Sequence, residues 1–351
     1  MTNNQRQEHV KFKTVLEALL DDSRPFPAAY LHLFSDLSPV RTQALVDVWP
    51  KVNPERRRNV LSDLEELADN DTLVSFVEIG RLALDDQDAM VRALGIRLLW
   101  EAEDTRLVPI FIKMLENDPD QAVRATAANG LGAYVYLGEI ENLPNGMLES
   151  IENILFKVVN AADQPDIVKR RALESLGYSS RSEVPALIKS AYNIGSPDWL
   201  ESALFAMGRS ADQSYGPAII KQLDHANPDV QYEAVRAAGE LQLEIARPIL
   251  LAYLEEGEDD DVRTAAIWSL SQIGGEGVRL ALEGLLDETE DDEELEIIEE
   301  ALDNLTFTED MAIFDLFDVD MGDDDSTIIE LDKPIQPDDG EDLDGNPPDE
   351  A

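Results

Sequence analysis

Residues 123–132 read V-R-A-T-A-A-N-G-L-G, and the pattern V-R-x-x-A-x-x-x-L-G, here called the repeat phrase, returns along the chain. Apolar or small residues at its first, fifth and ninth positions fall on one side of an α-helix. The commonest step between copies is 31–32 residues. The leading residues of the copies are Val40, Val91, Val123, Val168, Trp199, Val230, Val262 and Ile297.

The ends of these phrase helices also carry signals. Ser38-Pro39, Ser196-Pro197 and Asn227-Pro228 each offer an N-cap residue followed by proline at the first helical position. The glycine that closes the phrase suits the left-handed conformation that commonly ends a helix. The small central alanine should let a neighbouring helix approach closely.

A second helix is expected after each phrase helix. Its marker is a proline 17 or 18 residues after the leading position, followed by an apolar stripe; these prolines are Pro109, Pro185, Pro217 and Pro248. Two amphipathic helices in about 31 residues cannot bury their apolar faces alone, and stacked copies can. The sequence therefore predicts an all-α fold, a right-handed α-solenoid of about seven or eight helix pairs.

Three regions follow from where the phrase occurs. Residues 1–37 are expected to form an N-terminal helical cap, residues 38–307 the solenoid, and residues 308–351 an acidic, largely disordered tail. A longer step of 51 residues leaves room for an extra helix at Leu73–Leu84. A step of 45 residues holds an insertion at Gly138–Met147.

The phrase, with the V-P-x-L-I of Val184–Ile188, resembles the short HEAT repeat of phycobilin-lyase-type proteins with the ARM-type fold. The resemblance covers residues 38–305. The stretch before it, VLEALLDDSRPFPAAYLHLFSDLSP, resembles the leader of bacterial HEAT-repeat proteins of uncharacterised function. This resemblance implies a groove-bearing solenoid, and it brings in a lyase of bilin chromophores as an alternative function.

Charge limits the partners. The chain has 28 Lys and Arg against 74 Asp and Glu, a net charge of −46, which repels nucleic-acid phosphates and anionic lipid. We therefore expect no nucleic-acid or membrane partner and favour a protein partner with a basic surface. With no cysteine, no apolar leader segment and no apolar run of 18 residues, a cytoplasmic monomer is expected.

The tail carries 17 Asp or Glu and one Lys in residues 308–351. Within it, Ile313, Phe314, Leu316 and Phe317 form an apolar cluster among acidic residues. Two interpretations remain open: packing on the last repeat as a cap, or a short linear motif that folds on a partner.

Residues for chemistry are scarce. His9, His32 and His225 do not stand at metal-ligand spacing and supply none of the repeated His-Glu pairs with which the HEAT-type deoxyhypusine hydroxylase family holds iron. Asp318–Asp325 begins like an EF-hand loop, but Asp323 stands where glycine is required and Ile329 where glutamate is required. No catalytic residue, metal site or cofactor is predicted.

The aromatic and basic residues give two further hypotheses. Trp49, Trp100, Trp199 and Trp268 are interpreted as core or turn packing in preference to a ligand site. Four lysines follow the same apolar pair on successive second helices, which we expect to line the groove and to form a ladder about 10 Å per rung. This row could receive an acidic or phosphorylated peptide, or the tail; alternatively its members are ordinary surface lysines. They are Lys113, Lys157, Lys189 and Lys221.

The function predicted from sequence is a non-catalytic scaffold for protein–protein interaction, with the solenoid surface and the tail motif as contact regions. The alternative is an enzyme or enzyme subunit of the phycobilin-lyase type, which bilin absorbance of the purified protein would reveal. A metal-dependent hydroxylase is the weakest alternative, because the histidine pairs are missing.

Overall fold

The computed structural model describes residues 11–100, 102–255 and 259–319, with side chains described as far as residue 307. All regular elements in these ranges are helical. The α-helices are α1 (Phe12–Leu20), α2 (Pro39–Val48), α3 (Pro54–Asn70), α4 (Val77–Ala83), α5 (Ala89–Arg97), α6 (Val108–Asn117), α7 (Gln121–Glu139), α8 (Met147–Val159), α9 (Asp166–Leu176), α10 (Val184–Ile194), α11 (Pro197–Arg209), α12 (Gly216–Ile220), α13 (Pro228–Glu240), α14 (Arg247–Glu255), α15 (Asp260–Ile273), α16 (Val278–Glu288) and α17 (Asp292–Val319). Short 3-10 helices include η2 (Ala28–Phe34) in the N-terminal region.

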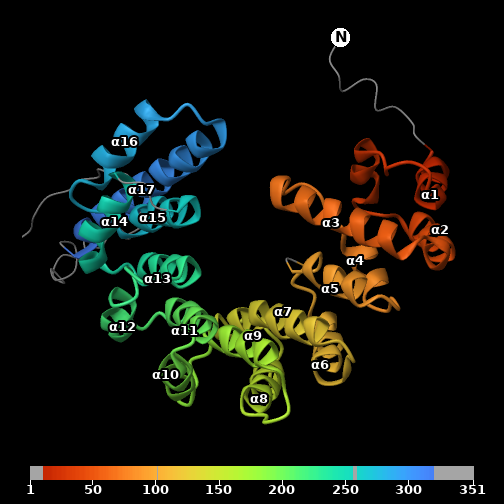
Figure 1. Ribbon diagram of the computed structural model, residues 1–351, viewed down its shortest axis with the longest axis horizontal. Helices are drawn as coiled ribbons and strands as arrows, with labels where there is room; N and C mark the ends of the chain where they lie inside the picture. Colours follow the sequence, from red (N-terminus) through yellow and green to blue (C-terminus); the bar gives the residue numbers. More distant parts are fainter. Residues whose placement is uncertain (1–10, 101, 256–258, 320–351) are drawn as a thin grey trace, which may run out of the picture. The chain divides into compact units, whose positions relative to one another are not determined.

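The helices from α5 to α16 form two layers. The phrase helices α5, α7, α9, α11, α13 and α15 pack directly against one another in chain order, and the second helices cover one side of them (Figure 1). Successive second helices contact each other far less. This arrangement confirms the all-α solenoid of stacked helix pairs.

The pairing differs from the expected order in one respect. Each proline-marked helix packs more extensively on the phrase helix that follows it than on the one before, as with α10 between α9 and α11. The structural repeat therefore begins at the proline-marked helix. Its proline occupies the first turn in α6, α10, α12 and α14, where a missing N–H leaves no carbonyl unpaired.

The apolar positions of the phrase form the core, with three exceptions among the leading residues: Val40, Trp199 and Ile297, the last of which is partly buried beside the fully buried Ile298. Val123, Ala127 and Leu131 have no exposed surface, and the same holds in most copies. Val40 is 81% exposed, so the first upstream copy is not a true phrase; α2 buries Leu45 instead. Trp199 is only partly buried, because its neighbour Leu200 takes the core position.

The glycines of the phrase do not end helices in the left-handed conformation, so that expectation is wrong. Gly177 has φ −55 in a right-handed turn, and Gly239 lies inside α13. A Cβ added at Gly239 would lie 2.7 Å from the Cα of Ser269 on α15, and one at Gly177 would lie 2.8 Å from the Cα of Ala206 on α11. Absence of a side chain at these positions allows successive phrase helices to approach closely.

The expected helix starts are largely confirmed. Prolines 39, 197 and 228 begin α2, α11 and α13. Of the three N-cap residues, only Asn227 caps its helix with its side chain, whose Oδ1 accepts a hydrogen bond from the backbone N–H of Val230 at 3.1 Å. The extra helix expected at 73–84 is α4, which the 17-residue α3 precedes, and the insertion is the link between α7 and α8.

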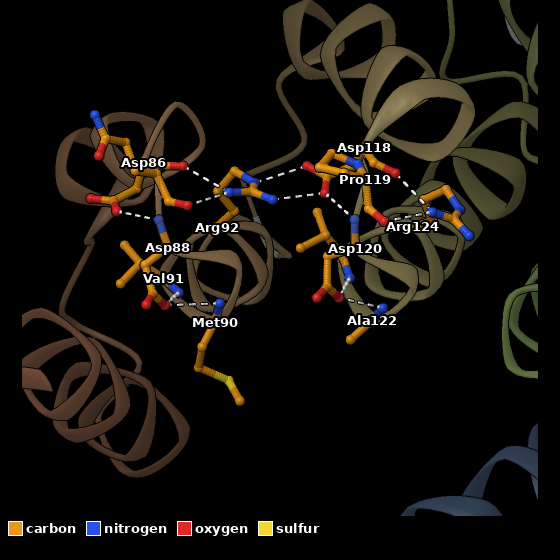
Figure 2. A network of polar contacts seen from close by, with 12 residues as sticks. Asp86, Asp88, Met90, Val91, Arg92, Asp118, Pro119, Asp120, Ala122 and Arg124 are labelled. Carbon is orange, nitrogen blue, oxygen red and sulfur yellow. Dashed lines mark hydrogen bonds and ion pairs between the residues drawn. The ribbon is translucent and has the colours of Figure 1, made fainter. Parts of the chain in front are cut away.

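A chain of arginine–aspartate contacts joins neighbouring repeats (Figure 2). The guanidinium of Arg92 donates to both carboxylate oxygens of Asp118 at 2.7 and 2.8 Å, and to the carbonyl of Asp86 at 2.9 Å. Arg124 repeats the pattern by donating to the carbonyl of Asp118 at 2.8 Å. Arg92 thus donates both to the loop that precedes its own helix and to the loop that precedes the next phrase helix.

The C-terminal part is described as a separate unit beginning at Thr306. Helix α17 continues to Val319, twelve residues beyond the boundary expected at 307. The backbone of residues 313–317 is helical, and the side chains of Ile313, Phe314, Leu316 and Phe317 lie outside the described residues, as do residues 320–351. No described helix is both long and apolar enough to cross a bilayer.

Candidate functional site

The lysine row lies at the solvent surface of the second-helix layer. Lys113, Lys157 and Lys189 stand on α6, α8 and α10, Lys221 follows α12 directly, and all four are exposed. Lys157 forms an ion pair with Glu116 at 2.9 Å. The second helices were expected to line the groove, but the hollow richest in aromatic side chains lies on the phrase helices. A binding role for the lysine row stays a prediction.

This hollow, here called the aromatic hollow, has a volume of about 420 Å³. It is formed where α7, α9 and α11 pack side by side, and the chain after α5 reaches it. Four aromatic residues line it: Trp100, Tyr136, Tyr178 and Phe205. Glu103 and Glu174 are its charged residues.

Trp100 and Tyr136 follow no repeated spacing, but Glu174, Tyr178 and Phe205 of this surface occupy a second stripe along the phrase helices. They stand two, six and ten positions after the leading residue, about 200° around the helix from the core stripe. These positions hold Arg170 and Glu174 on α9 and Tyr178 in the turn after it, and on α11 they hold Glu201, Phe205 and Arg209. Alternation of large aromatic and charged residues at these positions was the signal that the sequence reasoning missed.

Two aromatic side chains of the hollow are open to solvent. Trp100 is 49% exposed and Tyr136 is 50% exposed. Trp100 also lines an adjoining hollow of about 520 Å³, with Phe76, Glu65 and Arg97 among its other residues. Half-exposed aromatic residues in and beside such hollows form the kind of surface at which protein contacts concentrate.

Arginines connect the aromatic residues from one phrase helix to the next. The rings of Tyr136 and Tyr178 meet edge to face at 5.6 Å. The guanidinium of Arg209 lies 5.4 Å from the Tyr178 ring centre and 5.0 Å from that of Phe205. It also pairs with Glu240 at 3.0 Å. The stripe is therefore a continuous polar and aromatic surface across α7, α9, α11 and α13.

The stripe continues on α15. Arg236 lies 5.0 Å from the Trp268 ring centre. Of the four tryptophans, Trp49 is buried and donates a hydrogen bond to Asp86 at 2.9 Å, while Trp199 and Trp268 are partly buried. The packing interpretation holds for these three. Trp100, which lines the two hollows, departs from it.

A third hollow of about 380 Å³ lies at the N-terminal ends of α13 and α15 and is strongly acidic. Glu201, Asp229, Glu233, Asp259 and Asp261 line it together with Pro228 and Tyr232. Burial raises the pKa of Glu233 to about 7, and the charges of neighbouring glutamates add to the rise against the opposing charge of Arg236. Ionised carboxylates thus crowd each other here.

A buried polar cluster supports the floor of the aromatic hollow. Ser202 donates to Glu174 at 2.6 Å, Arg170 donates to Ser202 at 2.9 Å, and Arg171 pairs with Glu174 at 2.6 Å. Glu174 is 2% exposed. Because its carboxylate is paired on several sides, Glu174 is fixed in position and its charge is balanced within the protein.

Within the described ranges, no group of three or more His, Asp or Glu side chains is placed to hold a metal ion. His32 and His225 are far apart in the chain, and His9 lies outside the described residues. The acidic fragments from residue 320 onward also lie outside them.

Comparison with known proteins agrees with this architecture. A family model of HEAT repeats matches residues 79–144 and 216–303. These two stretches of the chain are therefore similar to HEAT repeats. Comparison of the sequence with curated proteins gave no match.

The solved structures that resemble this chain share low sequence identity with it. YibA from Escherichia coli is 18% identical over 79% of this chain and 95% of its own, with a TM-score of 0.40. The CpcE–CpcF complex of phycocyanin lyase from a Nostoc species is 22% identical over 65% of this chain and 94% of its own, with a TM-score of 0.43. Human deoxyhypusine hydroxylase is 17% identical over 75% of this chain and 95% of its own, with a TM-score of 0.33. These likenesses concern the fold alone.

Proposed function

We propose that this HEAT-repeat protein is a non-catalytic scaffold that binds a protein partner at the aromatic hollow and its neighbours. The observation that carries the proposal is the pair of half-exposed rings, Trp100 and Tyr136, which line the aromatic hollow on the phrase-helix layer, Trp100 also lining the adjoining hollow. Large aromatic side chains in such positions lose much apolar surface to water when a partner covers them. Tryptophan and tyrosine are correspondingly common among residues that dominate binding energy.

The stacked phrase helices support the same function. Their mutual packing holds the stripe residues on a rigid layer, so a partner meets a surface that needs little ordering before binding. The hollows are shallow features of an extended layer, which suits an elongated segment of a partner.

A capture experiment tests this proposal. Full-length protein and its Trp100→Ala/Tyr136→Ala double variant are immobilised and exposed to lysate of the source organism at about 50 and 300 mM salt, where surface charges are differently screened. We expect a discrete partner that survives high salt on the parent protein and is lost from the double variant. Leu280→Ala, at a 76% exposed site on α16, is the matched control and should keep the partner.

Two results would count against the proposal. A partner retained equally by the double variant would place recognition elsewhere, on the lysine row or the tail motif. Capture of basic proteins alone, all released at 300 mM salt, would reduce the surface to a non-specific electrostatic one.

A further inference from the structure

The aromatic hollow has the chemistry of a site for a cationic side chain. Trp100 and Tyr136 present half-exposed rings, and the exposed carboxylate of Glu103 belongs to the same hollow. A guanidinium or ammonium group gains from the negative face of an aromatic ring, and an adjacent carboxylate balances its charge. An apolar ligand would leave that carboxylate beside a desolvated surface, which is unfavourable.

The protein uses the same contact internally. Arg209 lies over Tyr178 and Phe205, Arg236 over Trp268, and Arg181 over Phe156 at 4.4 Å. Among the residues that the structure describes, none places a guanidinium over the ring of Trp100 or Tyr136. The contacts of Arg209 and Arg236 follow the stripe from the turn after α9 to α15, and the rings of Trp100 and Tyr136 stand where this row of contacts begins.

Charge around the three hollows points to the same ligand. Nine carboxylates line them and one guanidinium, that of Arg97, accompanies them. The carboxylates are Glu65, Asp69, Glu103, Glu174, Glu201, Asp229, Glu233, Asp259 and Asp261. An acidic segment would meet like charge at Glu103 and above all at the acidic hollow, where a basic segment gains instead.

We propose that the aromatic hollow binds an arginine or lysine side chain of a basic partner segment, held between Trp100 and Tyr136 and paired with Glu103. This inference rests on the proposed binding function and names the chemistry of its partner. The acidic hollow at the start of α13 and α15 favours further basic residues along the same segment.

Short peptides provide the test. The probe is a fluorescein-labelled nine-residue Gly/Ser peptide with two arginines and a leucine; its counterparts carry citrulline, a neutral isostere, or glutamate in place of both arginines. Binding to the full-length protein is followed by fluorescence anisotropy at 50 and 300 mM salt. We expect the arginine peptide to bind about tenfold more tightly than the citrulline peptide, and the glutamate peptide not to bind, since two cation contacts are lost.

Variants locate the contact. Trp100→Ala, Tyr136→Ala and Glu103→Gln should each weaken the arginine peptide by about three- to tenfold. Glu283→Gln on the exposed side of α16 is the matched acidic control and should leave binding unchanged. Circular dichroism of each variant checks that the helices are intact.

The outcomes separate this inference from the function on which it rests. Equal affinity for arginine and citrulline peptides, or an unchanged affinity in all three variants, would overturn the inference. If the double variant of the capture experiment still loses its partner, the binding function stands with a different ligand chemistry. If neither peptide binding nor capture depends on Trp100 and Tyr136, both proposals fail.

Discussion

Replacement of Gly239 by alanine tests the close approach of the phrase helices most directly. Gly239 lies inside α13 and faces Ser269 of α15. A Cβ there would lie 2.7 Å from the Cα and the Cβ of Ser269 and 2.6 Å from its Oγ. Carbon atoms in ordinary contact are about 3.5–4.0 Å apart, so α13 and α15 would have to separate by about 1 Å.

The expected magnitude comes from two opposing effects. Overpacking of a tightly packed interface destabilises a protein by about 1–3 kcal/mol. Alanine is favoured over glycine inside a helix by about 1 kcal/mol, which offsets part of the loss. Gly284 on α16 isolates the first effect, because a Cβ at this helical position would have no atom within 4 Å.

Urea unfolding followed by circular dichroism compares the two variants. Gly284→Ala should raise the free energy of unfolding by up to about 1 kcal/mol, and Gly239→Ala should fall about 1–3 kcal/mol below it. Because a stack of repeats need not unfold in one step, the comparison uses transition midpoints of the segment that melts first. Equal midpoints for the two variants would refute the packing argument.

Three further outcomes are expected. Burial raises the pKa of Glu233 to about 7. Between about pH 4.5 and 7 the folded state therefore binds more protons at this residue than the unfolded state does. The free energy of unfolding should fall by about 1–3 kcal/mol as pH rises through this window. Urea unfolding midpoints, measured as a function of pH, should show this loss in the parent protein and in Glu283→Gln but not in Glu233→Gln. The same pH dependence in all three proteins would contradict this prediction. Asp118→Ala removes the two carboxylate oxygens that accept from the partly buried Arg92 and should lower the free energy of unfolding by about 1–3 kcal/mol. Asp166→Ala breaks a 3.8 Å pair at a 71% exposed site and should lower it by less than about 1 kcal/mol. Equal effects of the two substitutions in urea unfolding would show that the repeat-to-repeat contact has no special weight. If the lysine row is a binding site, its replacement by glutamate should abolish capture of an acidic or phosphorylated peptide. Unchanged capture would show that the row consists of ordinary surface lysines, at Lys113, Lys157, Lys189 and Lys221.

The repeat phrase predicted the fold because its core positions are local. Val123, Ala127 and Leu131 share one helix face and are fully buried, and their spacing alone implies this. The upstream copy at Val40 shows the limit of the pattern, since a matching string of letters there faces solvent. Which neighbour a helix covers is a tertiary question, and the sequence placed the proline-marked helices with the wrong partner.

The candidate site was harder to predict. Trp100 stands where other copies have glycine and was interpreted as packing, yet it lies at 49% exposure between two hollows. Tyr136 lies beyond the end of the phrase, on the long α7. No spacing rule brings these residues together with Tyr178 and Phe205, because their proximity depends on how far each phrase helix is displaced from the last.

The sequence alone determined the all-α repeat architecture, the start of the solenoid helices at proline and the acidic character of the surface. Those properties depend on helix periodicity, on the missing N–H of proline and on summed charge, which are all local or additive. Tertiary structure decided that the glycines of the phrase allow close packing and that the aromatic hollow lies on the phrase helices. It also decided that aromatic and arginine side chains from successive phrase helices form one surface. Each of these depends on the separation and rotation of neighbouring helices, which the packing of small residues such as Gly239 and Ser269 sets.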